Sequence, residues 1–346
     1  MTNKDLFDIS WKVTEEEYRA NKALSYSTLA TYEREGFEGI PHLFDKKSSS
    51  SLTFGSCVDA IITGGMEEFN ERFLVADFEM PSETIKNIVQ ELYNKYKVTS
   101  LEKIDNALII TLTENFKYQL NWKPETRVKV IKEKGEKYYQ LLCLAKDKTI
   151  INFDIYNKVI AAVNALKESE STRYYFAENT PFDDTKRYYQ LKFKATLNNI
   201  EYRCMADLIA VDYKNKKITL VDLKTSSHTE YDFYKSFVQW DYHIQARLYY
   251  RIIKANLEKD EYFKDFKISN YFFIVVNKDT LQPLVWEFNN TKAKGQLIYG
   301  KSNNIIFRDP ETIGEELTYY IKNNSTLPRN INTNVPNNID KWLNSL

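Results

Sequence analysis

The chain has 346 residues, enough for one large domain or two small ones around a packed core. Its 48 lysines and arginines balance 48 aspartates and glutamates, so net charge gives no evidence of a nucleic-acid partner. No apolar run approaches the ~20 residues of a membrane span, and residues 1–13 lack a secretory pattern, so we expect a cytoplasmic protein without membrane contact.

The first half of the chain is predicted to be mainly helical. Helices are expected over residues 24–32 and 54–62. Further helical patterns fill residues 82–170, including 155–166, whose apolar residues recur on one side. We interpret residues 82–170 as a helical insertion within a domain that covers residues 1–290.

Strands are predicted to dominate after this insertion. They are expected at residues 187–197, 200–211 and 218–223. Asn198 and Asn199 form a turn between the first two, and a short polar segment separates the second from the third.

A helix is expected around Gln245 and Tyr249, which lie four residues apart and therefore on one helix face. The adjacent apolar stripe of Ile244, Leu248 and Ile252 would anchor this helix to the sheet. His243 and Arg247 on the same helix are candidates for phosphate contact, although surface exposure explains them equally well.

Two further strands, at 271–276 and 284–288, complete the expected sheet, and the first is apolar throughout, as in a strand covered on both faces. The predicted fold class is mixed α/β, a central mixed sheet flanked by helices. Residues 291–346 are predicted to form an asparagine-rich extension with a helix at 312–323.

The candidate site lies on the predicted hairpin. Asp222 and Lys224 share one strand face because successive side chains alternate, and the hairpin would bring Asp207 close to Asp222. Two neighbouring carboxylates repel unless a cation compensates them, and oxygen ligands favour Mg²⁺ or Mn²⁺. Lys224 would then orient or deprotonate the attacking water, or stabilise developing charge. The alternative is an ion pair on an exposed sheet edge.

The region around this hairpin is locally basic. Residues 186–224 contain nine lysines and arginines and four acidic residues, a net of 9 − 4 = +5. Lys192 and Lys194 alternate with apolar residues and would form a basic strand face. That face either follows a phosphate backbone or is an ordinary solvated surface.

Asp207, the run Asp222-Leu223-Lys224, and the Gln245 and Tyr249 pair together resemble the PD-(D/E)xK nuclease superfamily, in its RecB and lambda-exonuclease branch. The segments LSYSTL at 24–29, LTFGSCVD at 52–59 and AKDKTI at 145–150 are similar to the exodeoxyribonuclease VIII-like family. The resemblance spans about residues 18–290. It implies that Gln245 and Tyr249 lie beside the active site and position Lys224 or a DNA phosphate.

The chain departs from the family at two positions. Ala206 replaces a proline that shapes the strand entry, and Asp59 stands where a histidine or glutamate ligand is common. The resemblance implies metal ligation by Asp207, Asp222 and Asp59, with the Leu223 carbonyl as a further ligand. The alternative for Asp59 is a solvated helix residue.

The cysteines exclude the branch of the superfamily that binds an iron–sulfur cluster. Cys57, Cys143 and Cys204 are dispersed and lack C-x-x-C spacing, which favours a reducing compartment. An iron–sulfur cluster needs four thiolates, so no such cluster is expected.

The resemblance therefore implies a Mg²⁺-dependent exonuclease on linear duplex DNA, digesting 5′ to 3′ in phage-type recombination with a single-strand annealing protein. One alternative is an endonuclease on the same core. Another is a catalytically silent DNA-binding protein. Ring-shaped oligomers occur among related exonucleases, so a homo-oligomer is also open, and the origin would be phage or bacterial.

Overall fold

The computed structural model describes residues 3–45, 50–96, 98–229, 231–289, 297–299 and 304–323. The chain divides into two compact units. We call them the sheet unit, formed by Met1–Leu52 and Asn164–Leu346, and the helical unit, formed by Thr53–Val163. The helical unit thus begins earlier than the predicted insertion at 82–170 and ends before it.

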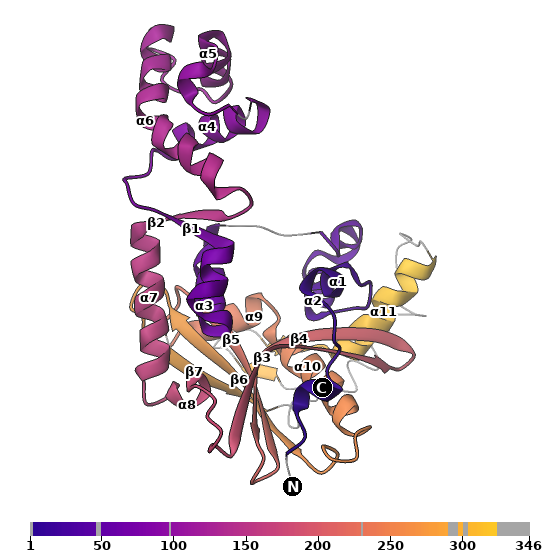
Figure 1. Ribbon diagram of the computed structural model, residues 1–346. Helices are drawn as coiled ribbons and strands as arrows, with labels where there is room; N and C mark the ends of the chain where they lie inside the picture. Colours follow the sequence, from indigo (N-terminus) through magenta and orange to yellow (C-terminus); the bar gives the residue numbers. More distant parts are fainter. Residues whose placement is uncertain are drawn as a thin grey trace. The chain divides into compact units, whose positions relative to one another are not determined.

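The sheet unit is built on a five-stranded mixed sheet (Figure 1). In spatial order its strands are β3 (Thr185–Leu197), β4 (Ile200–Asp212), β5 (Lys217–Ser226), β6 (Lys267–Asn277) and β7 (Pro283–Phe288). Neighbours are antiparallel except β5 and β6, which are parallel. A parallel pair needs a crossover, here made by α9 (Phe233–Gln239) and α10 (Tyr242–Leu257). The predicted mixed α/β class and the predicted strands are confirmed.

The turn between β3 and β4 forms at the two asparagines where the sequence predicts it. Asn198 and Asn199 adopt φ angles of 48° and 63°, a left-handed conformation that asparagine tolerates better than most residues. This turn sets the register of the long hairpin, in which Leu197 pairs with Ile200 and Thr185 with Asp212.

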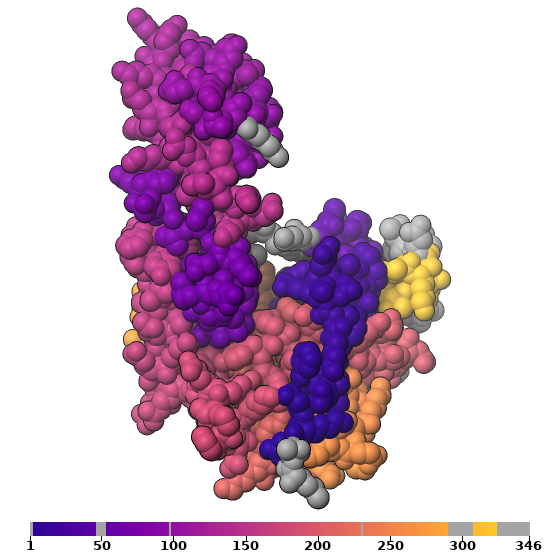
Figure 2. All heavy atoms as spheres, viewed as in Figure 1, coloured from indigo at the N-terminus to yellow at the C-terminus, as the bar shows by residue number. Residues whose placement is uncertain are grey.

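The N-terminal part of the sheet unit packs along the same sheet. It contains η1 (Leu6–Ile9), α1 (Glu15–Ala20), α2 (Tyr26–Glu35) and η2 (Gly36–His42). Leu24 forms an isolated parallel bridge to Tyr202, which fixes the start of α2 against β4. Farther toward the N-terminus, Asp5 pairs with Lys186 at 2.5 Å. Figure 2 shows this indigo segment lying along the surface of the strands it contacts.

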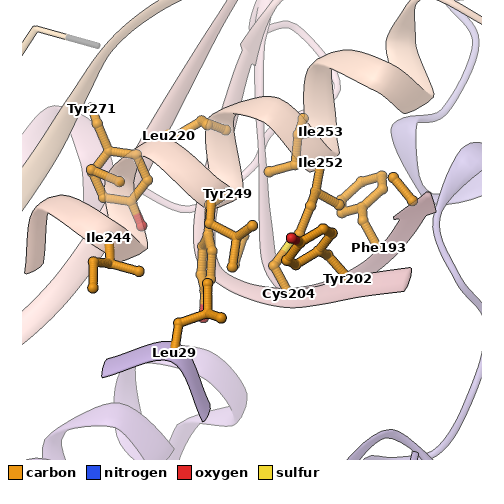
Figure 3. Packing of buried hydrophobic residues seen from close by; sticks show 14 of the residues in the cluster. Leu29, Phe193, Tyr202, Cys204, Leu220, Ile244, Tyr249, Ile252, Ile253 and Tyr271 are labelled. Carbon is orange, nitrogen blue, oxygen red and sulfur yellow. The ribbon is translucent and has the colours of Figure 1, made fainter. Parts of the chain in front are cut away.

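The core of the sheet unit lies between the sheet and α10. Ile244, Leu248 and Ile252 are fully buried, as their predicted stripe requires. They pack in one cluster with residues of β4 and β5 such as Ile209 and Leu220. Figure 3 shows Ile244, Tyr249 and Ile252 of α10 packed among residues of the strands and α2. This packing fixes which side of α10 faces the sheet.

The helical unit has a core of its own. In chain order it contains most of α3 (Ser50–Arg72), then β1 (Phe73–Ala76), α4 (Glu83–Tyr96), η3 (Leu101–Lys103), α5 (Asn106–Asn115), α6 (Pro124–Ala145), β2 (Thr149–Asn152) and most of α7 (Phe153–Glu168). Helices α4, α5 and α6 pack together around residues such as Ile88, Leu92 and Tyr139. α6 approaches α4 closely at Gly135, where a Cβ atom would lie 2.7 Å from Val89.

The helical unit is not purely helical. β1 and β2 form a parallel pair that the periodicity did not predict, because four-residue runs such as Thr149–Asn152 are too short to show a period. The helix predicted at 155–166 is confirmed as part of α7. No helix in the described part of the chain combines the length and apolarity needed to cross a membrane.

The C-terminal helix α11 (Pro310–Asn323) belongs to the core of the sheet unit. Ile313, Leu317 and Tyr320 are buried in the same cluster as α10, and a Cβ atom at Gly314 would overlap the Tyr202 ring. The predicted helix is confirmed, but the description of residues 291–346 as an extension does not hold for this segment. Residues 291–296, 300–303 and 324–346 lie outside the described residues; 297–299 and 304–306 form the antiparallel pair β8 (Leu297–Tyr299) and β9 (Asn304–Ile306).

Candidate active site

Asp207 and Asp222 occupy facing positions where the β4–β5 ladder ends. The ladder runs from Asp212 and Lys217 to Leu208 and Val221, and Asp207 and Asp222 are the next two residues along it. Beyond that point Oδ2 of Asp207 accepts a hydrogen bond from the Leu223 N–H at 3.0 Å. The Leu223 N–H thus bonds the Asp207 carboxylate and not a backbone carbonyl of β4. The regular pairing of β4 and β5 therefore ends at the candidate site.

The pairing of β4 with its other neighbour, β3, is also irregular at Asp207. Pairing between β3 and β4 includes Tyr189 with Leu208 and Leu191 with Ala206, but omits Gln190 and Asp207. Gln190 adopts φ 51°, in the left-handed region that residues other than glycine seldom enter. Irregular strand geometry of this kind re-aims side chains and is frequent beside active sites.

Asp222 is fully buried and held by two side chains. Lys224 Nζ lies 2.5 Å from its Oδ2, and the Gln245 side-chain amide donates to its Oδ1. The ion pair is therefore present, but β5 is a central strand rather than an exposed edge. Because a buried carboxylate is costly unless it is paired, the surface ion-pair alternative is wrong about the location of this pair.

Lys224 is a cation in this environment. Burial alone would lower the pKa of its ammonium, but the Asp222 carboxylate, helped by Asp207, outweighs burial and raises that pKa above its ordinary value. A lysine with a raised pKa remains charged at neutral pH. Of the predicted roles, charge stabilisation therefore suits this geometry better than proton abstraction.

Gln245 and Tyr249 both lie in the buried layer between α10 and the sheet. The Gln245 side-chain amide donates to Asp222, and its role in positioning Lys224 or a DNA phosphate stays a prediction. The Tyr249 ring packs against Tyr271 with centroids 6.4 Å apart. Burial raises the pKa of the Tyr249 phenol well above its ordinary value, and the Asp222 and Asp207 charges contribute to that rise. Tyr249 is thus a neutral phenol in the field of both carboxylates.

The two other phosphate candidates on α10 are buried. His243 is 2 % exposed and packs its ring against Phe307 at 4.4 Å. Arg247 is 4 % exposed and donates to the Phe307 carbonyl at 3.1 Å. Both residues therefore hold the C-terminal segment and are not surface contacts.

The oxygen atoms around Asp222 suit a hard divalent cation. Oε1 of Gln245 is a buried acceptor that receives no hydrogen bond from the described residues, whereas Oδ2 of Asp222 faces the Lys224 ammonium at 2.5 Å. With Asp207 they form a set of oxygen donors, the ligands that Mg²⁺ and Mn²⁺ prefer. The Lys224 ammonium supplies the compensating positive charge.

No group of three histidine, cysteine, aspartate or glutamate side chains gathers as a metal site within the described ranges. Two carboxylates nevertheless suffice for Mg²⁺, which commonly keeps several waters and takes further oxygens from a phosphate substrate. The Leu223 carbonyl remains a predicted ligand.

Asp59 belongs to the helical unit, on α3. Its Oδ2 lies 3.9 Å from Nη1 of Arg72, and its carbonyl oxygen accepts from Thr63 at 2.9 Å. Its role as a metal ligand stays a prediction.

Most of the local excess of positive charge is matched within the fold. Arg187 and Arg203 are buried, and several lysines of the region have acidic partners. These ion pairs are Lys186 with Asp5, Lys194 with Glu201, Lys214 with Asp184, Lys216 with Asp265 and Lys224 with Asp222. A phosphate-binding role for Lys192 and Lys194 stays a prediction.

Sequence reasoning missed Tyr242, the first residue of α10, whose ring lies 4.8 Å from Lys224 Nζ. Its position three residues before Gln245 could have identified it, because residues three apart on a helix face the same way. Tyr26, inside the segment at 24–29, was likewise not singled out, although its hydroxyl donates to the Trp240 carbonyl at 2.5 Å.

No family model matches the chain. No curated protein matches it. Among solved structures, one described as "Putative exonuclease" from Eubacterium rectale is similar, with a TM-score of 0.45 and 10% sequence identity over 94% of this chain and 91% of that chain. At this level of similarity, the function has to be argued from the side chains of this chain.

Proposed function

We propose that this protein is a metal-dependent deoxyribonuclease, an exonuclease that hydrolyses phosphodiester bonds from the ends of linear duplex DNA. The observation that carries the proposal is the face shared by Asp207, Asp222 and Lys224 where the β4–β5 ladder ends. Two carboxylates and an ammonium in a partly buried site form a constellation suited to phosphodiester cleavage.

Asp207 and Asp222 would hold Mg²⁺, with Mn²⁺ as a substitute, and Asp59 and the Leu223 carbonyl are further proposed ligands. When bound, the ion supplies positive charge at the phosphoryl oxygens and activates water for attack. The buried acceptor Gln245 Oε1, which has no described hydrogen-bond partner and whose amide nitrogen bonds Asp222, supports the choice of a cation.

The remaining side chains position charge around the scissile phosphate. As an ammonium, Lys224 would stabilise the negative charge that develops on the phosphoryl group. Gln245 fixes the orientation of Asp222 through its amide. Tyr249 would act as a neutral hydrogen-bond donor beside them.

The finer aspects of the proposal come from the family resemblance. It supports 5′ to 3′ digestion in phage-type recombination, in a bacterial or phage-infected cytoplasm, together with a single-strand annealing protein. A ring-shaped homo-oligomer would add processivity.

Two alternatives use the same fold. An endonuclease would share the chemistry and would also cut closed circles. A silent DNA-binding protein is suggested by Ala206 and Asp59, but such proteins usually lose the aspartate or lysine that Asp222 and Lys224 preserve here.

The test compares wild type with Lys224→Ala on linear duplex DNA labelled at either the 5′ or the 3′ end, and on closed circles. Each substrate is incubated with Mg²⁺, with Mn²⁺ and with chelator. We expect cation-dependent loss of linear DNA that Lys224→Ala abolishes, and the label released first gives the polarity.

The matched control is Lys214→Ala, which removes an exposed lysine at the β4–β5 turn, paired with Asp184 at 3.8 Å. It should digest DNA like wild type. Cutting of circles would support the endonuclease. Binding without cutting, equal in wild type and Lys224→Ala, would overturn the catalytic proposal.

A further inference from the structure

One turn of α10 contacts both members of the Lys224 and Asp222 ion pair. Tyr242 places its ring 4.8 Å from the Lys224 ammonium, and Gln245 donates to the Asp222 carboxylate. A cation within about 6 Å of an aromatic ring centroid is attracted by the ring's negative face. The Tyr242 ring and the Asp222 carboxylate therefore share the ammonium.

The Tyr242 ring is fixed by aromatic neighbours on other elements. It stacks on Phe273 of β6 with centroids 5.6 Å apart and an interplanar angle of 22°, and on Phe233 of α9 at 6.2 Å. Phe237 meets it edge-on at 6.3 Å. These contacts hold the ring in one orientation, so its position beneath Lys224 is set by the fold.

The N-terminal end of α10 is also fastened from α2. The Tyr26 hydroxyl and Arg34 both donate to the Trp240 carbonyl, at 2.5 and 3.3 Å. Arg34 also pairs with Asp241 at 3.4 Å, the residue that precedes Tyr242. The Tyr26 ring lies 6.3 Å from the Tyr242 ring. The start of α10 is thus held on two sides.

We propose that Tyr242 is a positioning residue, whose ring holds the Lys224 ammonium against Asp222 and ready for a phosphoryl group. The effect of Tyr242 on DNA cleavage rests on the proposed nuclease function. The effect of Tyr242 on the Lys224 ammonium does not depend on that function. The attraction comes from the ring and not from the hydroxyl, so phenylalanine should replace tyrosine and an aliphatic side chain should not.

The first experiment measures the reactivity of Lys224 in the full-length protein. Wild type, Tyr242→Phe and Tyr242→Leu are treated with trace acetic anhydride in chelator at several pH values, and acetylation of each lysine is quantified by mass spectrometry. We expect Tyr242→Phe to match wild type and Tyr242→Leu to label Lys224 about fivefold faster, because the ring no longer stabilises the cation.

The matched control is Phe263→Leu, which removes a fully buried ring of the same core that packs on Tyr262 and Phe266. It should leave Lys224 labelling unchanged. Equal labelling of Lys224 in wild type and Tyr242→Leu would overturn the inference. The inference would also fail if Phe263→Leu labelled Lys224 as fast as Tyr242→Leu does, since loss of core packing alone would then explain the effect.

Leucine at position 242 could unfold the local cluster, so a second series keeps the shape of the ring. Phenylalanine and its mono-, di- and trifluorinated analogues are incorporated at position 242, which weakens the negative face of the ring step by step. Lys224 labelling should rise with each fluorine, and a flat series would contradict the inference.

The same variants are assayed for digestion of linear DNA over a range of pH. Tyr242→Leu should lower kcat more than it changes KM and displace the pH profile, and Tyr242→Phe should restore both. If wild type cuts no DNA, the nuclease proposal fails, while the labelling result still decides the role of Tyr242.

Discussion

The Gln245 side-chain amide donates to Oδ1 of Asp222, which joins α10 to the central strand β5 in the buried layer of the sheet unit. Lys224 holds the other oxygen of the same carboxylate at 2.5 Å. Each Asp222 oxygen thus contacts a different side chain, so substitutions of Lys224 and of Gln245 test the two contacts separately.

Removal of the Lys224 charge should destabilise the fold in a way that divalent cations reverse. Lys224→Met leaves Asp222 buried without its ammonium, so we expect a loss of about 3 kcal/mol in the free energy of unfolding in chelator. Added Mg²⁺ or Mn²⁺ should restore part of it, because an ion bound only by the folded state stabilises that state. Urea unfolding with and without the cation measures both effects.

Lys214→Met is the control, because Lys214 also pairs with an aspartate, Asp184, but is exposed at the turn. It should change neither the stability nor the cation response. A Lys224→Met variant as stable as wild type in chelator would show that Asp222 does not depend on this ammonium.

Removal of the Gln245 amide should affect both stability and activity. Gln245→Ala leaves Oδ1 of Asp222 without a hydrogen bond, and an unsatisfied buried acceptor costs about 1–3 kcal/mol. Thermal unfolding would measure the loss, and DNA digestion should slow because Asp222 loses its fixed orientation. Gln140→Ala is a suitable comparison, since Gln140 is exposed and bonds only to Glu136 among the described contacts. Equal stability of the two variants would refute this role for Gln245.

Asp241 should make the protein less stable as the pH rises from about 4 to about 6. Burial raises the pKa of its carboxyl to about 6, against the opposing effect of Arg34 and with a further rise from Glu33. The folded state therefore binds this proton more tightly than the unfolded state, and loses that advantage as the group ionises.

Asp241→Asn should remove this dependence. Asparagine tolerates the left-handed φ of 53° at this position, and we expect the variant to be about 1–2 kcal/mol more stable than wild type at pH 7, after allowing for partial solvent screening. Urea unfolding at pH 4.5, 5.5 and 7 compares the two. A difference that does not grow with pH would contradict the assignment, and Asp8→Asn, at an exposed carboxylate, is the control.

His243 should make the fold sensitive to acid. Burial lowers the pKa of its imidazole to about 3, helped by the positive charge of Arg247. The unfolded state therefore binds the proton first, so wild type should lose about 1.4 kcal/mol for each pH unit below ~6.5, until the folded imidazole is also protonated. This contribution is complete above that pH.

His243→Phe should reduce the acid sensitivity, because a similar ring would pack on Phe307 without a titrating nitrogen. Chemical unfolding between pH 4 and 7 tests this expectation. The exposed His42, which pairs with Asp45, provides the control His42→Phe. Parallel pH profiles of wild type and His243→Phe would show that another group causes the acid loss.

The sequence alone determined the local geometry of the site. Strand alternation placed Asp222 and Lys224 on one face, the short turn brought Asp207 opposite, and helical spacing placed Gln245 and Tyr249 on one side of α10. These relationships depend only on the backbone periods of strands and helices, which neighbouring residues set.

Only the tertiary structure decided which surfaces are buried. The ion pair lies on a central strand, the ring of Tyr242 lies beneath Lys224, and α11 packs into the core of the sheet unit. Each depends on contacts between residues far apart in the chain, and burial of this kind leaves no periodic trace in a single segment. The same non-local packing makes Asp222 a fully buried carboxylate whose charge must be balanced by Lys224.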